Sequence, residues 1–179
     1  MAASGAVDWQ AIQRGDPARL VVETEARANP FWPMPGALEA VGRLRQAGYV
    51  LGIVSNAQFY TPSLFPALFG RRAEELGFNP KRIFYSYAHG MAKPSVRFFQ
   101  LAQHAPVQCH IAAAQTLHLG NDMLHDIWPA PQIGFRAVLF ADDGRTLRLR
   151  TDQSQLQNLR PDVAVSSLTE LAHWLTSPP

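Results

Sequence analysis

Three short stretches of the chain carry polar side chains that can act together on an anion. The first is an apolar run that ends in Ser55 and Asn56, a hydroxyl followed by an amide. The second is Lys93, which directly precedes a proline, and the third holds Asp122 and Asp126, two carboxylates four residues apart. Hydroxyl and ammonium groups bind phosphate oxygens, and paired carboxylates suit an octahedral magnesium ion. The three stretches together predict a phosphate-and-magnesium site.

Taken alone, each of these side chains also has a purely structural interpretation. Ser55 and Asn56 suit an ordinary turn after a strand. Lys93 also fits a solvated surface lysine, although a cation at a helix entrance gains nothing from the helix dipole and therefore favours a facing anion. Asp122 could stabilise the first turn of a helix. We favour a metal site for the pair, because Asp122 and Asp126 lie one helical turn apart directly after an apolar run.

The segments around these groups alternate between strand and helix patterns. Short continuous apolar runs are typical of strands buried on both faces of a parallel sheet, and we expect this of residues 49–54. Strands separated by helix-length segments predict right-handed βαβ crossovers, and hence an α/β fold with a mostly parallel sheet. The predicted strands are 49–54, 82–87, 116–119, 136–140 and 163–165, and the predicted helices begin near Leu38, Thr61, Pro94 and Ser167.

The predicted sheet explains how distant side chains can converge. In an open parallel sheet, ligands bind beyond the carboxyl ends of the strands. Ser55, Lys93 and Asp126 all follow predicted strands. We therefore expect the Ser55 hydroxyl, the backbone amides after it and the Asn56 side chain to bind phosphate oxygens opposite Lys93.

The N-terminal part of the chain differs from the rest. Residues 8–28 are predicted to be helical, and residues 29–36 contain three prolines, which makes a stiff connector. This connector predicts two parts, an accessory segment over residues 1–32 and a core over residues 33–179. Residues 142–161 are polar and poorly periodic, and are predicted to form a loop.

Composition restricts the class of protein. The net charge of +2 is too small and too scattered to favour nucleic acid, and the arginines at 145, 148 and 150 are interpreted as a solvated face. No apolar stretch approaches the ~20 residues that span a bilayer. The first residues lack the pattern of a signal peptide. We therefore expect a cytoplasmic protein with neither nucleic acid nor a membrane as partner.

Cysteine and histidine add no site of their own. The single cysteine, Cys109, excludes an internal disulfide and is interpreted as a small buried side chain. The six histidines have no spacing typical of a zinc site. His125 lies inside the acidic stretch, where we expect a structural or solvent-facing role.

The ordered series Gly52–Asn56, Lys93–Pro94 and Gly120–Asp126 resembles the haloacid dehalogenase-like (HAD) hydrolase superfamily, and the resemblance extends over about residues 33–176. It implies a Rossmann-like three-layer core, with residues 8–34 as the remnant of an N-terminal helical cap.

The resemblance also implies roles for the polar residues. Ser55 would bind the transferred phosphoryl group, and Lys93 would offset the negative charge of the nucleophile and the substrate. Asp126 would hold Mg²⁺ together with Asp122 or Asn121. Members of the family usually have Asp where Asn121 stands, which leaves open which of the two faces the metal. The implied activity is magnesium-dependent hydrolysis of a small phosphorylated substrate.

One family motif has no counterpart in the sequence. It is a strand ending in Asp-x-Asp, whose first carboxylate attacks phosphorus. Asp8 is the only nearby candidate, but no apolar strand precedes it and position 10 is Gln. By resemblance, the absent strand lies between those ending near Ser55 and Leu119, so two strand edges would be unpaired. We therefore expect a chain that is truncated, is read from a late start codon or has lost its nucleophile, and that is inactive alone.

Two other hypotheses stay open. The chain could be a non-catalytic module that binds phosphate, a nucleotide or a protein, or a second copy or partner chain could cover the missing strand. Whether the chain is an enzyme is therefore undecided. The substrate cannot be named, because specificity would lie largely in the cap. Lys93 and the acidic pair favour phosphoryl transfer over dehalogenation, since dehalogenation has no need of magnesium.

Overall fold

The computed structural model describes residues 17–105, 111–142, 144 and 146–177. The chain divides into two compact units, one ending at Pro33 and the other beginning at Met34. The described part of the first unit contains helix α2 (Pro17–Ala28), which agrees with the C-terminal part of the predicted helix. The predictions for residues 8–16 and for Cys109 lie outside the described residues. No described helix has the length and hydrophobicity needed to cross a bilayer.

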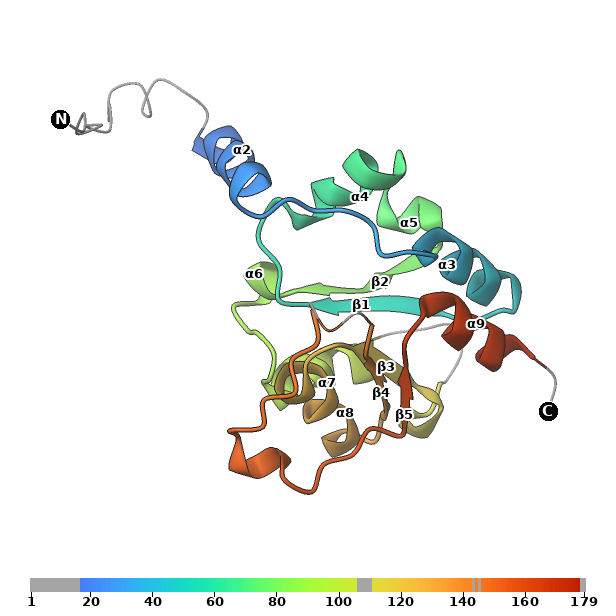
Figure 1. Ribbon diagram of the computed structural model, residues 1–179. Coiled ribbons are helices and arrows are strands. Elements are labelled where there is room, and N and C mark those ends of the chain that lie inside the picture. The colour runs from blue at the N-terminus through green and yellow to red at the C-terminus, as the bar shows by residue number, and fades with distance from the viewer. Residues whose placement is uncertain (1–16, 106–110, 143, 145, 178–179) are drawn as a thin grey trace. The chain divides into compact units, whose positions relative to one another are not determined.

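The second unit contains two parallel sheets (Figure 1). The first pairs β1 (Leu51–Ser55) with β2 (Phe78–Tyr85), and the second has the order β3 (Leu117–Gly120), β4 (Arg136–Phe140), β5 (Val163–Val165). All of these pairings are parallel. The predicted α/β class with a mostly parallel arrangement is therefore confirmed. The predicted bounds of β4 and β5 are correct. Strand β2 begins earlier than predicted, and it ends at Tyr85 because residues 86–89 form a short helix.

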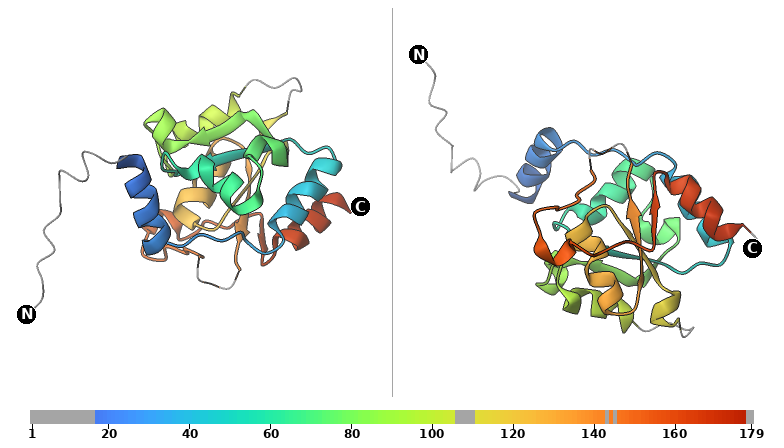
Figure 2. Two further views of the ribbon diagram at one scale, coloured as in Figure 1. Left: turned by 90° about the horizontal axis from the view of Figure 1, so that it is seen from above. Right: turned by 60° about the horizontal axis from the view of Figure 1, so that its bottom comes forward.

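Helices fill the connections between the strands. Helix α9 begins where predicted, since the Ser167 hydroxyl accepts the Glu170 N–H at 3.3 Å. Helices α3 and α9 lie side by side (Figure 2), and Arg43 Nε donates to Thr176 Oγ1 at 2.6 Å. The helical segments are α3 (Ala37–Gln46), α4 (Thr61–Phe69), α5 (Ala73–Leu76), α6 (Ser86–His89), α7 (Val96–Gln103), η1 (Ala113–Gln115), η2 (Met123–Ile127), α8 (Pro129–Gln132), η3 (Ser154–Leu156) and α9 (Leu168–Thr176).

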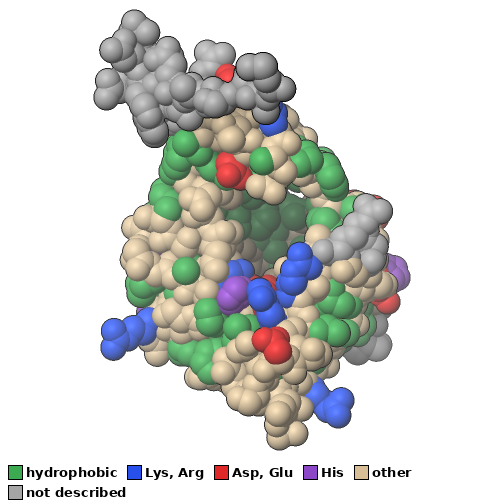
Figure 3. Space-filling view, turned by 60° about the vertical axis from the view of Figure 1, so that its left-hand side comes forward, with side chains coloured by type: hydrophobic (Ala, Val, Ile, Leu, Met, Phe, Trp, Pro, Cys, Tyr) green, Lys and Arg blue, Asp and Glu red, His purple; other side chains and the backbone are tan. Residues whose placement is uncertain are grey.

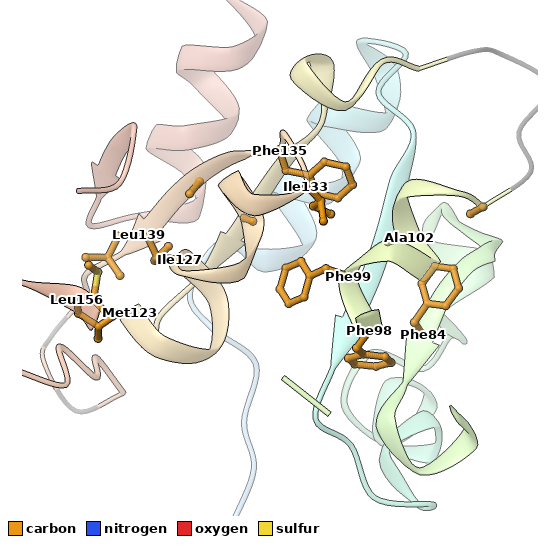
Figure 4. Close-up of a cluster of buried hydrophobic side chains, with 13 residues drawn as sticks. Phe84, Phe98, Phe99, Ala102, Met123, Ile127, Ile133, Phe135, Leu139 and Leu156 are labelled. Atoms are coloured by element: carbon orange, nitrogen blue, oxygen red, sulfur yellow. The ribbon is translucent and has the colours of Figure 1, made fainter. Parts of the chain in front are cut away.

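Helix α7 joins the two sheets through the main hydrophobic core. Its Phe98 and Phe99 are fully buried. They belong to one cluster with Phe84 of β2, Leu139 of β4 and Ile127 (Figure 4). Because this helix contacts β1, β2 and α8, it fixes the loop that precedes it relative to both sheets.

The strands β1 and β3 are each paired on one side only among the described residues. The prediction that residues 49–54 form a strand buried on both faces is wrong. Strand β1 begins at Leu51 and is at most half-buried along its length, and β3 is half-buried too. By contrast β4, which has a neighbour on each side, is buried at four of its five residues. The missing second neighbour explains the exposure of β1 and β3.

Replacing Phe98 by Ala tests the core that joins the sheets. We expect the free energy of unfolding to fall by about 3–5 kcal/mol, because a fully buried ring is lost and a cavity is left. The matched change Phe59→Ala should cost less than about 1 kcal/mol, since 47% of that residue is exposed. Urea unfolding followed by circular dichroism measures both losses. Equal losses in the two variants would contradict this assignment of the core.

Candidate functional site

The Asn56 side chain clamps the backbone of Lys93. Its Oδ1 accepts the Lys93 N–H at 2.6 Å, and its Nδ2 donates to the Lys93 carbonyl at 3.0 Å. The Lys93–Pro94 peptide bond is cis. Asn56, in the loop after β1, therefore binds both backbone polar groups of Lys93, in the loop before α7. The sequence predicts that the Asn56 side chain binds phosphate. In the structure this side chain bonds the backbone of Lys93 instead.

Lys93 reaches the third predicted stretch through a buried ion pair. Its Nζ lies 2.6 Å from Oδ1 of Asp126, and the two side chains are 15% and 4% exposed. The other carboxylate oxygen accepts the backbone N–H groups of Asn121 and Asp122, both at 3.1 Å. Asn56, Lys93 and Asp126 therefore form one bonded group, and Ser55 directly precedes Asn56 in the chain.

The strand before Asp126 is shaped to receive its carboxylate. Gly120, the last residue of β3, lies directly beneath it, and a Cβ on this glycine would overlap the carboxylate carbon. His118 lies on the same face of β3, two residues earlier, and its Nε2 is 3.4 Å from Asp126 Oδ1. The imidazole packs edge-on against Phe99 with ring centroids 4.7 Å apart. Sequence analysis missed His118, although this two-residue spacing from Gly120 was a usable signal.

Asp126 is held in its charged form. Burial alone would raise the pKa of this carboxyl, but the hydrogen bond from His118 and the charge of Lys93 outweigh burial and hold its pKa far below the usual range. The carboxylate therefore balances the ammonium charge inside the protein over the whole neutral range.

Asp122 has the structural role that was the alternative interpretation. Its Oδ1 accepts the N–H groups of Leu124 and His125 at 2.9 and 3.1 Å, which caps the π-helical turn η2. Its Oδ2 lies 2.8 Å from Arg150 Nη2 and 3.2 Å from His125 Nδ1. Burial acts to raise the pKa of Asp122, but the Arg150 hydrogen bond and the two backbone N–H groups lower it overall.

A segment of the polar loop fastens onto this turn. Arg148 donates its N–H to the Asn121 carbonyl at 2.9 Å and accepts the Met123 N–H at 2.9 Å. The Asn121 side chain donates to the Thr146 carbonyl at 2.6 Å. We call residues 146–150 the strap. Arg150 stays partly exposed, as the interpretation of a solvated face predicts, but the strap also brings its guanidinium onto Asp122, a contact that the sequence did not predict.

Ser55 ends β1 opposite Tyr85 and is half-buried. Two of the backbone N–H groups that follow it are already engaged, at Ala57 with the Ser86 hydroxyl and at Gln58 with the Thr61 hydroxyl, each at 3.0 Å. Of the predicted phosphate ligands, these two amides and the Asn56 side chain are therefore used inside the protein. The Ser55 hydroxyl and the Lys93 ammonium are the groups still suited to an anion.

Charged side chains gather on one face of the molecule. Figure 3 shows basic, acidic and histidine side chains close together on one face of the molecule. Two recesses of about 520 and 350 Å³ lie elsewhere, and neither is lined by Ser55, Lys93 or Asp126. Neither recess therefore belongs to the candidate site.

Comparison with known proteins tests the resemblance. No family model and no curated protein sequence matches the chain. Among solved structures it is similar to a HAD phosphatase from Thermococcus onnurineus, with 21% identity and a TM-score of 0.59 over 79% of this chain and 57% of that chain. It is also similar to a dehalogenase, with 18% identity and a TM-score of 0.65 over 94% of this chain and 69% of that chain. A HAD-hydrolase from Bacillus subtilis, solved bound to magnesium, shares 23% identity and a TM-score of 0.60 over 80% of this chain and 56% of that chain.

The chain has a HAD-like fold.

The resemblance is thereby confirmed at the level of the fold. The chain spans 57% and 56% of the phosphatase and the HAD-hydrolase. Within the HAD-like fold, Lys93 pairs with Asp126. Asp122 instead caps the turn η2 and pairs with Arg150.

Magnesium does not fit the described residues as they are arranged. Each carboxylate oxygen of Asp122 and Asp126 already accepts at least two hydrogen bonds or charged contacts, which uses its lone pairs. The Asn121 amide nitrogen is bonded to the strap. Among the described residues no three acidic, histidine or cysteine side chains lie together as a metal cluster. An ion at 2.0–2.1 Å from these oxygens, as Mg²⁺ requires, would have to displace Lys93 or Arg150.

Asp126→Asn tests the buried ion pair. We expect roughly 3 kcal/mol of destabilisation at pH 7, because the Lys93 ammonium loses its charge partner. Since folding lowers the pKa of Asp126, its contribution is complete above the unfolded pKa of about 3.9 and is lost as the pH falls below that value. Urea unfolding at pH 3, 4, 5 and 7 should therefore show the gap between wild type and variant narrowing below about pH 4. Glu39→Gln, at an exposed position of α3, is the control. A gap that stays constant with pH would contradict this role.

Proposed function

We propose that this chain acts as a HAD-type hydrolase domain whose described residues bind the anionic group of a small phosphorylated substrate in the cytoplasm. The observation that carries the proposal is the Lys93 ammonium, which Asp126 holds at 2.6 Å while Asn56, just after β1, binds the backbone of the lysine. A cation that the protein orients from both ends needs no rearrangement when an anion arrives. The HAD-like fold and the hydrolases among its structural neighbours support the same function.

In this proposal each side chain has a defined task. The Ser55 hydroxyl donates a hydrogen bond to a phosphoryl oxygen, and Lys93 Nζ offsets the negative charge that the substrate brings. Asp126 keeps the ammonium in place and does not attack, because both of its oxygens are occupied. Attack by a carboxylate, as in the HAD resemblance, would need a group other than Asp126. We propose that the described part of the chain binds without turnover.

Magnesium is no part of this proposal. The sequence resemblance predicts it, and one structural neighbour binds it, but the arrangement of Asp122 and Asp126 gives it no free oxygen. Magnesium dependence stays a prediction.

Metal-free hydrolysis is a second candidate function. The similarity to the dehalogenase covers 94% of this chain, with a TM-score of 0.65. Carboxylates that are already neutralised by internal cations also suit chemistry that needs no divalent ion. In that case Ser55 and Lys93 would bind the substrate of a dehalogenation rather than a phosphoryl group.

Binding of orthovanadate, a phosphate analogue, tests the proposed anion site. We expect saturable binding by isothermal titration calorimetry. Ser55→Ala should weaken it about tenfold, since a hydrogen bond to a charged group is lost. Ser63→Ala, at an exposed position of α4, should leave it unchanged. Binding without release of phosphate from p-nitrophenyl phosphate favours the non-catalytic alternative, and turnover favours the enzyme. Absence of vanadate binding, or equal binding in both variants, would contradict a phosphate site.

The one-sided pairing of β1 and β3 motivates a partner. We propose that a second copy or another chain pairs with these edges, since unpaired parallel edges present unused backbone N–H and carbonyl groups. Sedimentation velocity over a range of protein concentrations should then reveal dimers or larger species that grow with concentration. A single monomeric species at every concentration would rule out self-association through these edges.

A further inference from the structure

Arg150 pairs with Asp122, one of the two carboxylates for which the sequence predicts a metal. Its Nη2 and Nε lie 2.8 and 3.2 Å from Asp122 Oδ2, so two guanidinium nitrogens donate to one carboxylate oxygen. Nε also lies 3.4 Å from Oδ1. The Asp122 residue is 7% exposed. A buried carboxylate held by a guanidinium in this way already has the charge compensation that a divalent ion would provide.

The backbone of Arg150 is adapted to this contact. Arg150 is the one residue other than glycine with a positive φ in the described ranges, at 53°. Such a conformation is uncommon for a residue with a side chain and persists only where the surroundings fix it. The strap supplies that fixation through Thr146 and Arg148, which bond to Asn121 and Met123 on either side of Asp122. The arginine is therefore part of a built arrangement.

The charges of the site balance without a metal. Lys93 pairs with Asp126 and Arg150 pairs with Asp122, so two cations meet two carboxylates. The backbone N–H groups that also point at these oxygens add partial positive charge. A divalent cation would enter a region that already has no net negative charge, which electrostatics disfavours.

We propose that Arg150 takes the place at Asp122 that the resemblance gave to magnesium, so that this site works with two internal cations and binds no divalent ion. This inference deepens the proposed function, and it rests on that function for the statement that the site binds an anion. The arginine keeps the Asp122 turn rigid, and this turn presents the N–H groups of Asn121 and Asp122 to Asp126.

Binding of Mn²⁺, followed by electron paramagnetic resonance, tests the proposal on the whole chain with no substrate present. We expect no saturable binding to the wild type up to about 5 mM Mn²⁺, an ion that favours carboxylate ligands. Arg150→Gln removes the cation and frees oxygens of Asp122. It should bind Mn²⁺ saturably with a Kd below about 0.5 mM, at least about tenfold under the limit expected for the wild type.

Two control variants complete the design. Arg150→Lys keeps a positive charge at the strap and should exclude Mn²⁺ as the wild type does. Arg136→Gln removes another arginine that pairs with an aspartate, Asp162, at a distance of 3.2 Å on the surface. It should not create a Mn²⁺ site.

Two results would overturn the inference. One is saturable Mn²⁺ binding by the wild type below about 5 mM, and the other is a failure of Arg150→Gln to gain binding over Arg150→Lys. The vanadate titration of wild type without divalent ions separates this inference from the proposed function. Loss of vanadate binding alone removes the proposed function, whereas the Mn²⁺ results alone decide the role of Arg150.

Discussion

The buried ion pair between Lys93 and Asp126 is the interaction on which the rest of this site depends. An ammonium and a carboxylate that are largely removed from water are tolerated only when each compensates the other and the remaining polar atoms are bonded. The N–H groups of Asn121 and Asp122 bond the second oxygen of Asp126, and the Asn56 clamp holds the backbone of Lys93 in place. Three loops from distant parts of the sequence are therefore forced to meet.

The hydrophobic core makes this meeting rigid. Helix α7 follows the Lys93 loop and buries Phe98 and Phe99 between the two sheets. Phe99 also supports the imidazole of His118, which faces Asp126. Apolar packing thus supports the loop that carries Lys93, and the sheets can hold a common site although β1 and β3 are not paired with each other in the described residues.

Charge balance links the fold to the proposed function. Each carboxylate of the site has its own internal cation, so a substrate anion meets a positive group, Lys93, whose own position is already fixed. Electrostatic preorganisation of this kind is a major source of stabilisation in enzyme sites. The same balance argues for the guanidinium of Arg150 in place of a metal ion, and it makes the two carboxylates parts of the scaffold rather than reacting groups.

The sequence by itself determined those features that depend on neighbouring residues. Apolar runs gave the bounds of β4 and β5, Ser167 marked the start of α9, and three short motifs predicted the HAD-like fold and the meeting of Lys93 with Asp126. Only the tertiary structure decided which partner each polar group takes. Arg150 lies 28 residues from Asp122 in a loop without periodicity, and Asn56 bonds a backbone 37 residues away, so no local pattern could reveal either contact. The exposure of β1 has the same origin, because burial of a strand depends on neighbours that are distant in the sequence.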